Sequence, residues 1–386
     1  MDASGFQRID IRKVKTPCYI VDEVALEENL KILQNIKKRT GCKILLALKA
    51  FSMYSTFPQL RTYLDGTCAS SPNEARLGFE EFKKEVHTFA PAYSEEDFQQ
   101  IVKYSDHIVF NSFNQWNKFK SKLENSKNLK KNKIEAGIRI NPQYSETKVA
   151  LYDACAPYSR FGVIKDKIKD QNLSGIVGIH FHTLCQQNSD SLKRTVDVIS
   201  KNFGEEIRKM KWVNFGGGHH ITRSDYDIDL LCETIIQFKK EFGVEVYLEP
   251  GEAVALNTGI LVSQVMDIVD NDRKIAILDT SAEAHMPDVL AMPYTPIIIG
   301  SGKFDEHKYK YRLAGVTCLS GDIIGDYSFP RELKIGQKLV FLDMAIYSMV
   351  KNTTFNGINL PSILLHKKGK FRLIKKFGYK DFKRRV

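Results

Sequence analysis

The sequence predicts an α/β protein that consists of a (β/α)₈ TIM barrel and a second, mainly β domain. From Lys43 onward, short β-rich runs alternate with segments of helical periodicity. Eight such runs precede Gly251, and the β-like runs after it follow one another with little helical period between them. Repeated strand–helix units build a parallel sheet, and eight of them suit a closed barrel better than an open doubly wound sheet.

The barrel elements follow from this alternation. The eight predicted strands are Lys43–Leu48, Thr67–Ser70, Val86–Phe89, His107–Phe110, Ala136–Ile140, Ile176–His182, Trp212–Phe215 and Glu245–Glu249. The predicted helices between them include Asn73–Phe82, Glu95–Tyr104, Ser189–Asn202 and Asp225–Phe242. Several of these begin with Ser, Asp or Asn, whose side chains cap the first N–H groups of a helix.

The β domain is predicted from runs that Gly, Pro and Asp turns separate. These runs are Gly259–Asp270, Lys274–Asp279, Tyr309–Cys318, Gln337–Leu342 and Phe371–Lys375. The segment Thr16–Val21 also has strand character and precedes a predicted helix, Glu23–Lys38. We expect this strand to pair with the distant β domain rather than with the barrel. The predicted domains are residues 24–255 for the barrel and residues 1–23 with 256–386 for the β domain.

Composition excludes several classes of protein. The 386 residues are 43% hydrophobic and 27% charged, which excludes intrinsic disorder. Apolar segments such as Met292–Gly300 are short and carry Pro or Gly, so no membrane span is expected. Residues 1–16 show no secretory signal, so a cytoplasmic protein is expected. The seven cysteines include no C-x-x-C pair, which favours free thiols over disulfides or a thiolate zinc site.

The net charge of +11 raises the question of a nucleic acid or acidic lipid partner. Lysines concentrate at Lys120–Lys133, Lys165–Lys169 and Lys367–Arg385. These runs are typical of solvated helix faces, a loop and a terminus, because no recognition motif with interleaved aromatic residues accompanies them. We therefore expect neither a nucleic acid nor a membrane as partner.

Function in such barrels concentrates where strands end and loops begin. Lys49 follows five apolar residues at the end of the first predicted strand. Its amine either extends to solvent along the aliphatic stem or is shielded from water and suited to a Schiff base. Arg139 lies in an apolar run near the end of the fifth strand and needs a hydrogen-bonding or anionic partner if buried. An internal ion pair is the alternative to a ligand contact.

Two histidines, His180 and His182, end the sixth predicted strand on one face. An H-x-H pair can bind a metal, but no Asp or Cys with supporting ligand spacing follows, so we expect no metal. A ring packed against a flat ligand is the preferred interpretation of His182.

Polar and glycine residues also end the last two predicted strands. Gly216, Gly217 and Gly218 follow the seventh, where three glycines let the backbone approach an anion and direct N–H groups at phosphate oxygens. A flexible turn without a ligand is the alternative. Glu249 ends the eighth strand, where a helix-capping or surface acid is equally plausible for that residue alone.

These residues together describe a site for pyridoxal 5′-phosphate. Lys49 would form the Schiff base, the three glycines would hold the phosphate, and Glu249 would pair with the pyridine nitrogen. A protonated nitrogen makes the ring an electron sink. The joint occurrence of these groups at one barrel face favours the cofactor over the separate alternatives.

Five segments resemble the fold-type III pyridoxal-phosphate decarboxylases, which combine an alanine-racemase-type barrel with a β domain. The resemblance covers residues 16–371 and is strongest to the carboxynorspermidine and carboxyspermidine decarboxylase branch. The segments are Leu46-Ala47-Leu48-Lys49-Ala50, Gly178-Ile179-His180-Phe181-His182, Asn214-Phe215-Gly216-Gly217-Gly218-His219, Leu248-Glu249-Pro250-Gly251-Glu252 and His285-Met286-Pro287-Asp288. The resemblance implies decarboxylation to norspermidine or spermidine in polyamine biosynthesis.

The resemblance also implies roles for single residues. Lys49 bonds the cofactor, His182 stacks on its ring, Glu249 pairs with the ring nitrogen, and Tyr347 lies near the phosphate. Arg139 is grouped with these cofactor-binding residues.

Members of this family build each active site across a homodimer. By this resemblance, Cys318 of a second subunit protonates the carbon that has lost CO₂, and Asp322 meets a substrate amine. A small buried cysteine without a catalytic role is the alternative for Cys318.

Departures from the family pattern point to the substrate. Relatives that act on ornithine or diaminopimelate commonly have arginine where this chain has Glu252. Glu252, together with His285 and Asp288, suits a polycationic polyamine substrate. Thr183 begins the segment that replaces the family's Gly-Ser pair, so a serine contact to the phosphate is in doubt. Another decarboxylase or racemase on this scaffold, or a non-catalytic cofactor-binding homologue, stays open as an alternative.

Overall fold

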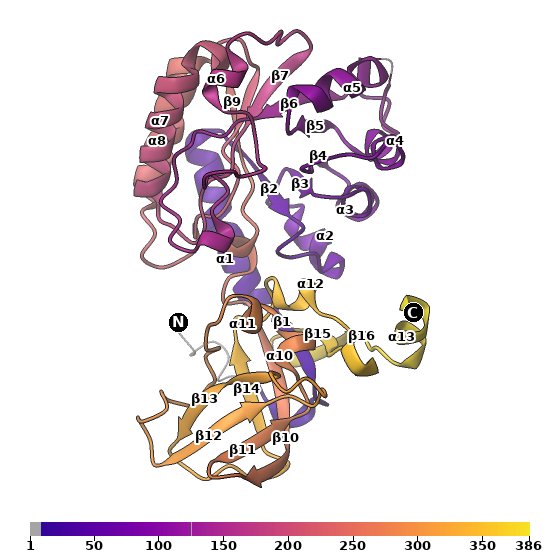
Figure 1. Ribbon diagram of the computed structural model, residues 1–386, viewed down its shortest axis with the longest axis vertical. Coiled ribbons are helices and arrows are strands. Elements are labelled where there is room, and N and C mark those ends of the chain that lie inside the picture. Colours follow the sequence, from indigo (N-terminus) through magenta and orange to yellow (C-terminus); the bar gives the residue numbers. More distant parts are fainter. Residues whose placement is uncertain (1–8, 125) are drawn as a thin grey trace. The chain divides into compact units, whose positions relative to one another are not determined.

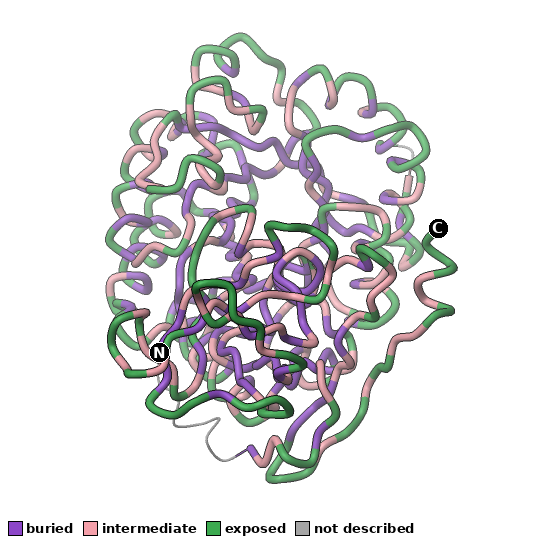
Figure 2. The backbone as a smooth tube through the Cα atoms, turned by 60° about the horizontal axis from the view of Figure 1, so that its bottom comes forward, coloured by how far each residue is buried: buried purple, intermediate pink, exposed green. Residues whose placement is uncertain are grey.

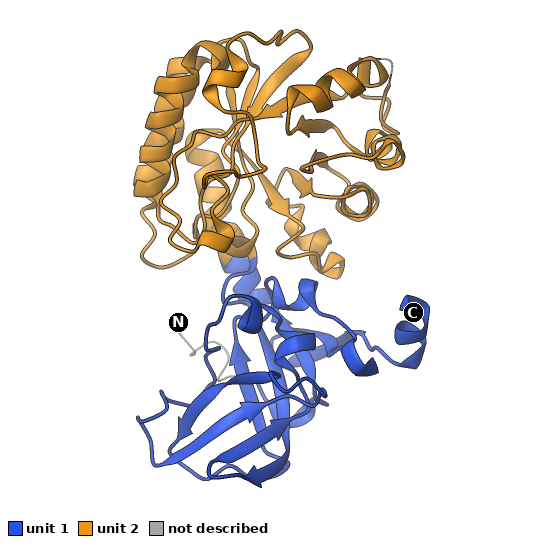
Figure 3. Ribbon diagram, viewed as in Figure 1, with its two compact units in different colours: residues 1–28, 255–386 blue, residues 29–254 orange. Residues whose placement is uncertain are grey.

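The computed structural model describes residues 9–124 and 126–386. The chain divides into two compact units, Asn29–Val254 and Met1–Glu28 with Ala255–Val386 (Figure 3). Helix α1 (Glu23–Thr40) crosses from one unit into the other. Residues 1–8 lie outside the described residues. They form the first half of the segment, residues 1–16, that was predicted to lack a secretory signal.

The unit Asn29–Val254 is a closed barrel of parallel strands, in which each strand pairs with the next and β9 pairs with β2 (Figure 1). The strands are β2 (Lys43–Ala47), β3 (Gly66–Ala69), β4 (Glu85–Phe89), β5 (His107–Phe110), β6 (Glu135–Arg139), β7 (Ile176–His180), β8 (Trp212–Asn214) and β9 (Glu245–Leu248). Every predicted barrel strand is present, with ends within two residues of the prediction. The predicted barrel fold is confirmed.

Helices cover the outside of the strands, and their outward turns are exposed (Figure 2). Besides α1 they are α2 (Phe57–Leu60), α3 (Pro72–Leu77), α4 (Glu95–Tyr104), α5 (Phe113–Glu124), α6 (Lys165–Ile168), α7 (Ser189–Ile207), α8 (Ile228–Phe242) and α9 (Glu252–Ala255). Short 3₁₀ turns are η3 (Tyr54–Thr56) and η5 (Ala150–Tyr152). Ser94 caps α4 and Asp227 caps α8, each by accepting a backbone N–H three residues on.

One predicted helix, Asn73–Phe82, is wrong in its second half. Helix α3 ends at Leu77, and a π-helical turn, η4 (Gly78–Phe82), follows it. Gly78 allows this turn to approach β3, because a Cβ there would lie 2.3 Å from Oγ1 of Thr67. Hydrophobic periodicity indicates which face is buried but not the hydrogen-bond register, so the sequence alone does not predict the change.

The second unit is built on one sheet in the order β13-β12-β11-β10-β1-β15-β16, with β14 paired to β10. Its strands are β1 (Cys18–Asp22), β10 (Gly259–Asp270), β11 (Lys274–Leu278), β12 (Tyr309–Ala314), β13 (Ile323–Phe329), β14 (Lys338–Leu342), β15 (Ser362–Lys367) and β16 (Lys370–Lys375). Its helices are α10 (Ala282–His285), α11 (Asp288–Ala291), α12 (Ser348–Lys351) and α13 (Tyr379–Arg385), with 3₁₀ turns η2 (Ile11–Lys13) and η6 (Phe355–Gly357). The predicted mainly β domain is confirmed.

The N-terminal strand β1 joins this sheet, as predicted. It pairs antiparallel with β10 and parallel with β15. Two strands of the sheet, β13 and β15, were not predicted. Strand β13 contains Gly325 and Asp326, residue types with low strand propensity, and its pairing with β12 outweighs that propensity.

Aromatic side chains fill the barrel near the amino ends of its strands. Trp212, the first residue of β8, packs with Leu45, Val109 and Tyr247. A Cβ at Gly178 would lie 2.0 Å from the Trp212 indole, so that glycine makes room for the ring. Among the described residues, no helix is both long and apolar enough to pass through a lipid bilayer.

Candidate active site

The carboxyl ends of the barrel strands gather four of the predicted site residues. Lys49 follows β2, His182 follows β7, Gly216 follows β8 and Glu249 follows β9. The backbone N–H of Glu249 donates to the carbonyl of Gly216 at 2.7 Å. Since the strands are parallel, their carboxyl ends meet at one rim, which is where barrel enzymes place their chemistry.

Glu249 is an ionised carboxylate with a hydrogen-bond donor at each oxygen. Nδ2 of Asn214 lies 2.7 Å from Oε1, and Nε2 of His180 lies 3.2 Å from Oε2. Burial alone would raise the pKa of Glu249, but the contacts with His180 and Asn214 outweigh it and lower the pKa to about 2. A permanent negative charge at this rim suits a protonated ring nitrogen.

His182 is oriented by the glycine loop. Its Nδ1 accepts the backbone N–H of Gly217 at 3.0 Å. Burial lowers the pKa of His182 well below its ordinary value, and the positive charges of Lys49 and Arg139 lower it further. The ring is therefore neutral, which suits packing against a flat aromatic ligand.

Arg139 is buried, and its partners differ from the internal ion pair that was the alternative to a ligand contact. It donates to the carbonyl of His182 at 3.1 Å, and its guanidinium lies 4.6 Å from the ring centre of Phe89 and 4.5 Å from that of Phe161. Burial lowers the pKa of Arg139 to about 10. Two aromatic faces and a carbonyl thus satisfy the cation and hold the segment that carries His182.

The three glycines do not all direct their N–H groups at a ligand, which corrects one expectation. The N–H of Gly216 donates to Oδ1 of Asn214 at 2.9 Å, and the N–H of Gly217 donates to His182. A Cβ at Gly218 would lie 1.8 Å from the carbonyl oxygen of Leu184. The glycines are thus required by the close packing of the loops after β7, β8 and β9.

Lys49 is exposed in this chain, so the expectation of an amine shielded from water is wrong here. The strand before it, β2, is almost entirely buried. Lys49 is the second residue beyond the carboxyl end of that strand. Its charge lowers the pKa of both His180 and His182, so the amine belongs to the same rim.

Glu252 lies at the same rim and already has two partners. Nε2 of Gln186 donates to its Oε1 at 2.9 Å, and Nε2 of His220 lies 3.2 Å from its Oε2. Its side chain is 17% exposed. Contact with a substrate amine stays a prediction for Glu252.

In the second unit, Asp322 is 3% exposed and accepts hydrogen bonds at both oxygens. Its donors are Oγ of Ser281, Oγ1 and the N–H of Thr317, and the N–H groups of Ala282 and Glu283. These contacts give Asp322 a structural role, because they tie the loop after β12 to the start of α10. The predicted contact of Asp322 with a substrate amine has no support from this geometry and stays a prediction.

Cys318 lies in the loop that Asp322 holds, between β12 and β13, and its side chain is exposed. Its backbone N–H donates to Oδ1 of Asn356 at 2.7 Å. The alternative of a small buried cysteine is thus wrong. An exposed thiol on an anchored loop is compatible with a contribution to a second subunit.

His285 and Asp288 are both engaged within the second unit. His285 is 1% exposed, its Nδ1 lies 3.0 Å from Oγ1 of Thr280, and burial lowers its pKa to about 4. Asp288 forms an ion pair with Lys351. Substrate binding by either residue stays a prediction, and the burial of His285 weighs against it.

Tyr347 is half-buried and has a backbone φ of 49° and ψ of −55°. It is the central residue of a γ-turn, because the N–H of Ser348 bonds to the carbonyl of Ile346. A non-glycine residue at such angles is strained, and strain of this kind concentrates at functional sites. In the sequence, Tyr347 stands out only through its resemblance to the family, and nothing there indicates the strained backbone angles.

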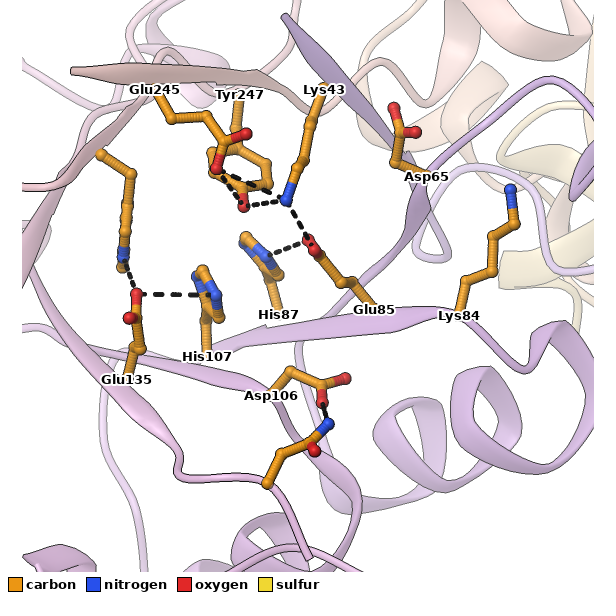
Figure 4. Close-up of polar contacts among 12 residues, drawn as sticks. Lys43, Asp65, Lys84, Glu85, His87, Asp106, His107, Glu135, Glu245 and Tyr247 are labelled. Atoms are coloured by element: carbon orange, nitrogen blue, oxygen red, sulfur yellow. Dashed lines mark hydrogen bonds and ion pairs between the residues drawn. The ribbon is translucent and has the colours of Figure 1, made fainter. Parts of the chain in front are cut away.

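A second polar cluster occupies the amino ends of the strands (Figure 4). Glu85, His87 and His107 each place a ligand atom within 4.8 Å of the others, and Nζ of Lys43 lies 2.7 Å from Glu85. The two imidazole rings stack with 20° between their planes. Lys43 also forms an ion pair with the Glu85 carboxylate. Ring stacking and ion pairing contribute to the cluster, and the absence of a metal stays a prediction.

Comparison with known proteins decides the family. The family model described as pyridoxal-dependent decarboxylase, C-terminal sheet domain, matches residues 18–345. The chain belongs to the pyridoxal-dependent decarboxylase family. The family membership that the sequence resemblance predicted is confirmed. As a decarboxylase, the protein is a carboxy-lyase.

Two curated relatives of this decarboxylase cover nearly its whole length. The carboxynorspermidine/carboxyspermidine decarboxylase of Campylobacter jejuni is 43% identical over 96% of this chain and 98% of its own. The carboxyaminopropylagmatine decarboxylase of Synechocystis is 40% identical over 97% of this chain and 96% of its own. A crystal structure of carboxynorspermidine decarboxylase from C. jejuni in complex with norspermidine is 42% identical, with a TM-score of 0.88 over 97% of this chain and 100% of the other.

The rim residues of this decarboxylase fit the cofactor that the family name implies. Lys49 offers an amine for an aldehyde, His182 a neutral ring for stacking, and Glu249 a carboxylate that stays ionised although it is buried. His180 and Asn214, which hold that carboxylate, were not predicted as site residues. The alternation of His180 with His182 and the place of Asn214 two residues before Gly216 were the available signals.

Proposed function

We propose that this decarboxylase converts carboxynorspermidine, carboxyspermidine or both to norspermidine and spermidine in polyamine biosynthesis, with pyridoxal 5′-phosphate as cofactor. The identity of 43% to the Campylobacter enzyme, over almost the full length of both chains, carries this proposal. A pair of rim features, the amine of Lys49 and the ionised Glu249, supports the cofactor chemistry.

Each residue has one task in the proposed reaction. Pyridoxal 5′-phosphate supplies an aldehyde that bonds amines and a ring that accepts the electron pair released when CO₂ leaves. Lys49 would hold the cofactor through its amine, and Glu249 would hold a proton at the ring nitrogen. His182 would pack against the cofactor ring, and Gly216 to Gly218 shape the loop beside His182. Cys318 would hold the thiol proton that replaces the carboxyl group in the product.

We further propose that two copies of the chain share their active sites. Cys318 would then come from the second copy, which the exposure of its loop supports. Lys49→Ala and Cys318→Ala homodimers are each expected to lack normal turnover. Mixed and allowed to exchange subunits, they form heterodimers with one intact site, so about a quarter of wild-type activity should return. Failure of the mixture to regain activity, with exchange verified by mass, would contradict the shared site.

A second substrate is favoured by a separate observation. The Synechocystis relative is nearly as similar, at 40% identity over 97% of the chain, and acts on carboxyaminopropylagmatine according to its name. That compound ends in a guanidinium instead of an amine. Planar guanidinium and compact ammonium groups demand different carboxylate geometry, so a site built for one discriminates against the other.

The test is a comparison of kcat/KM for CO₂ release from four compounds by the cofactor-loaded enzyme. We expect carboxynorspermidine or carboxyspermidine to exceed carboxyaminopropylagmatine by at least about tenfold and diaminopimelate by more. A higher kcat/KM for carboxyaminopropylagmatine than for carboxynorspermidine and carboxyspermidine would instead assign carboxyaminopropylagmatine as the substrate. Release of CO₂ from diaminopimelate alone, or inversion of an amino acid without CO₂, would overturn the proposal.

A further inference from the structure

The donors around Glu249 are deeply buried. Asn214 is fully buried and His180 is 2% exposed. Hydrogen bonds to a charged group strengthen where water is excluded, and they also set the direction of that group. Each oxygen of Glu249 therefore has a buried N–H donor that orients it.

The second contact of Asn214 determines which end of its amide faces Glu249. Its Oδ1 accepts the N–H of Gly216 at 2.9 Å, so the NH₂ group is the end that faces Oε1 of Glu249. One amide thus links the carboxylate to the first glycine of the loop. The two parts of the site cannot move independently while this bridge is intact.

The protonation of His180 follows from the same kind of reasoning. Its Nε2 faces a carboxylate oxygen, so this nitrogen carries the proton, because two acceptors would repel. Among the described residues, Nδ1 of His180 is buried and meets no hydrogen-bond partner. Burial also lowers the pKa of His180. The ring is a neutral donor with one useful proton.

We infer that His180 and Asn214 are positioning residues that hold the Glu249 carboxylate ionised and aimed at the ring nitrogen of pyridoxal phosphate. The inference rests on the proposed function, in which Glu249 meets that nitrogen. Other groups also interact with Glu249. The Cys68 thiol forms a side-chain hydrogen bond with it, and burial together with the charge of Glu249 raises the pKa of that thiol. Arg139 and His87 interact with Glu249 electrostatically. His180 and Asn214 differ from Arg139 and His87 because they donate hydrogen bonds to Glu249, one to each carboxylate oxygen, and they differ from Cys68 because their donors are N–H groups, which are stronger donors than a thiol.

Three variants separate this role from general packing. Asn214→Asp keeps an oxygen for Gly216 but places a second oxygen against Glu249, where two carboxylates must share a proton. His180→Leu removes the donor, and His180→Gln retains an N–H group. We expect the Kd of the apoenzyme for pyridoxal phosphate to rise about tenfold or more in the first two variants and less than about threefold in His180→Gln.

The deciding probe is the 1-deaza analogue of pyridoxal phosphate, in which C–H replaces the ring nitrogen. Since Glu249 has no nitrogen to pair with in this ligand, Asn214→Asp and His180→Leu should bind it within about twofold of the wild type. His366→Leu is the matched control, because it removes another buried histidine–carboxylate contact, 2.7 Å from Asp22, in the other unit. Both ligands should bind this control as they bind the wild type.

Equal loss of affinity for both ligands would overturn the inference, since it would show only damage to the fold. Unchanged affinity for pyridoxal phosphate in both variants would overturn it as well. If Asn214→Asp does not fold by circular dichroism, the comparison of His180→Leu with His180→Gln decides alone. The variants can show the expected binding pattern while the wild-type enzyme decarboxylates no carboxylated triamine. That result would overturn the proposed substrate and leave this inference standing.

Discussion

The backbone N–H of Gly217 donates a hydrogen bond to Nδ1 of His182 across 3.0 Å. Because Nδ1 accepts, the proton of the neutral ring is on Nε2, so this contact selects the tautomer. Burial and nearby positive charges, which lower the pKa of His182, keep the ring neutral. The loop after β8 thus sets the direction and the tautomer of a ring that follows β7.

Replacement of Lys49 by alanine should abolish catalysis, because the amine that bonds the aldehyde is lost. We expect kcat to fall by at least about a thousandfold and the visible absorbance of the bound cofactor to change. Lys118→Ala, at a residue with a 52% exposed side chain on α5, is the control and should retain activity. Near-normal CO₂ release by Lys49→Ala would show that another amine bonds the cofactor.

Gly218→Ala should destabilise the barrel. The glycine has a φ of 88°, and an added Cβ would lie 1.8 Å from the carbonyl oxygen of Leu184. We expect a loss of about 2–4 kcal/mol in the free energy of unfolding, measured by chemical denaturation. Gly204→Ala, inside α7, meets its nearest atom at 3.5 Å and should be neutral or stabilising by up to about 1 kcal/mol. Equal stability of the two variants would contradict the packing argument.

Asp322→Ala should loosen the loop that carries Cys318. The substitution leaves the donors of Ser281 and Thr317 without an acceptor, which we expect to cost about 3 kcal/mol in unfolding free energy. Alkylation of Cys318 should also become faster, because its loop is no longer anchored. A stable variant with an unchanged alkylation rate but a raised KM would instead favour the predicted substrate contact.

His285 should make stability depend on pH. Burial lowers its pKa from 6.5 to about 4, so the unfolded chain takes up a proton at a higher pH than the folded chain. Its contribution to stability is therefore complete above pH 6.5 and is lost as the pH falls toward 4, by about 3 kcal/mol. His285→Leu should lack this component. Parallel stability curves for wild type and variant over this range would contradict the assignment.

Glu252→Gln should weaken substrate binding if the carboxylate attracts a polycation. The amide retains the size of the side chain and can still contact Gln186 and His220. We expect kcat/KM to fall about tenfold, mostly through KM, and the difference from wild type to shrink at high salt. Glu205→Gln, on the exposed face of α7, should leave both constants unchanged. An unchanged KM in Glu252→Gln would show that Glu252 contacts only residues of the barrel and not the substrate.

Local patterns were sufficient for most of the site. Lys49 and Glu249 were predicted because each ends a short apolar run, and strand ends can be recognised from a few adjacent residues. Asn214 and His180 were missed because nothing in their own segments shows that they contact Glu249. Such a contact joins residues far apart in the sequence, and only the closure of the barrel brings them together.

The sequence by itself determined the eight-stranded barrel, the β domain after it and the rim residues that suit pyridoxal phosphate, because periodicity and strand ends are local properties. The tertiary structure decided which hydrogen bonds those residues make. It paired β1 with β15 and left Lys49 exposed. It also directed the N–H groups of Gly216 and Gly217 to side chains of the site instead of to a ligand. These outcomes depend on the packing of distant segments, which satisfies buried polar groups with whichever partners the fold brings near.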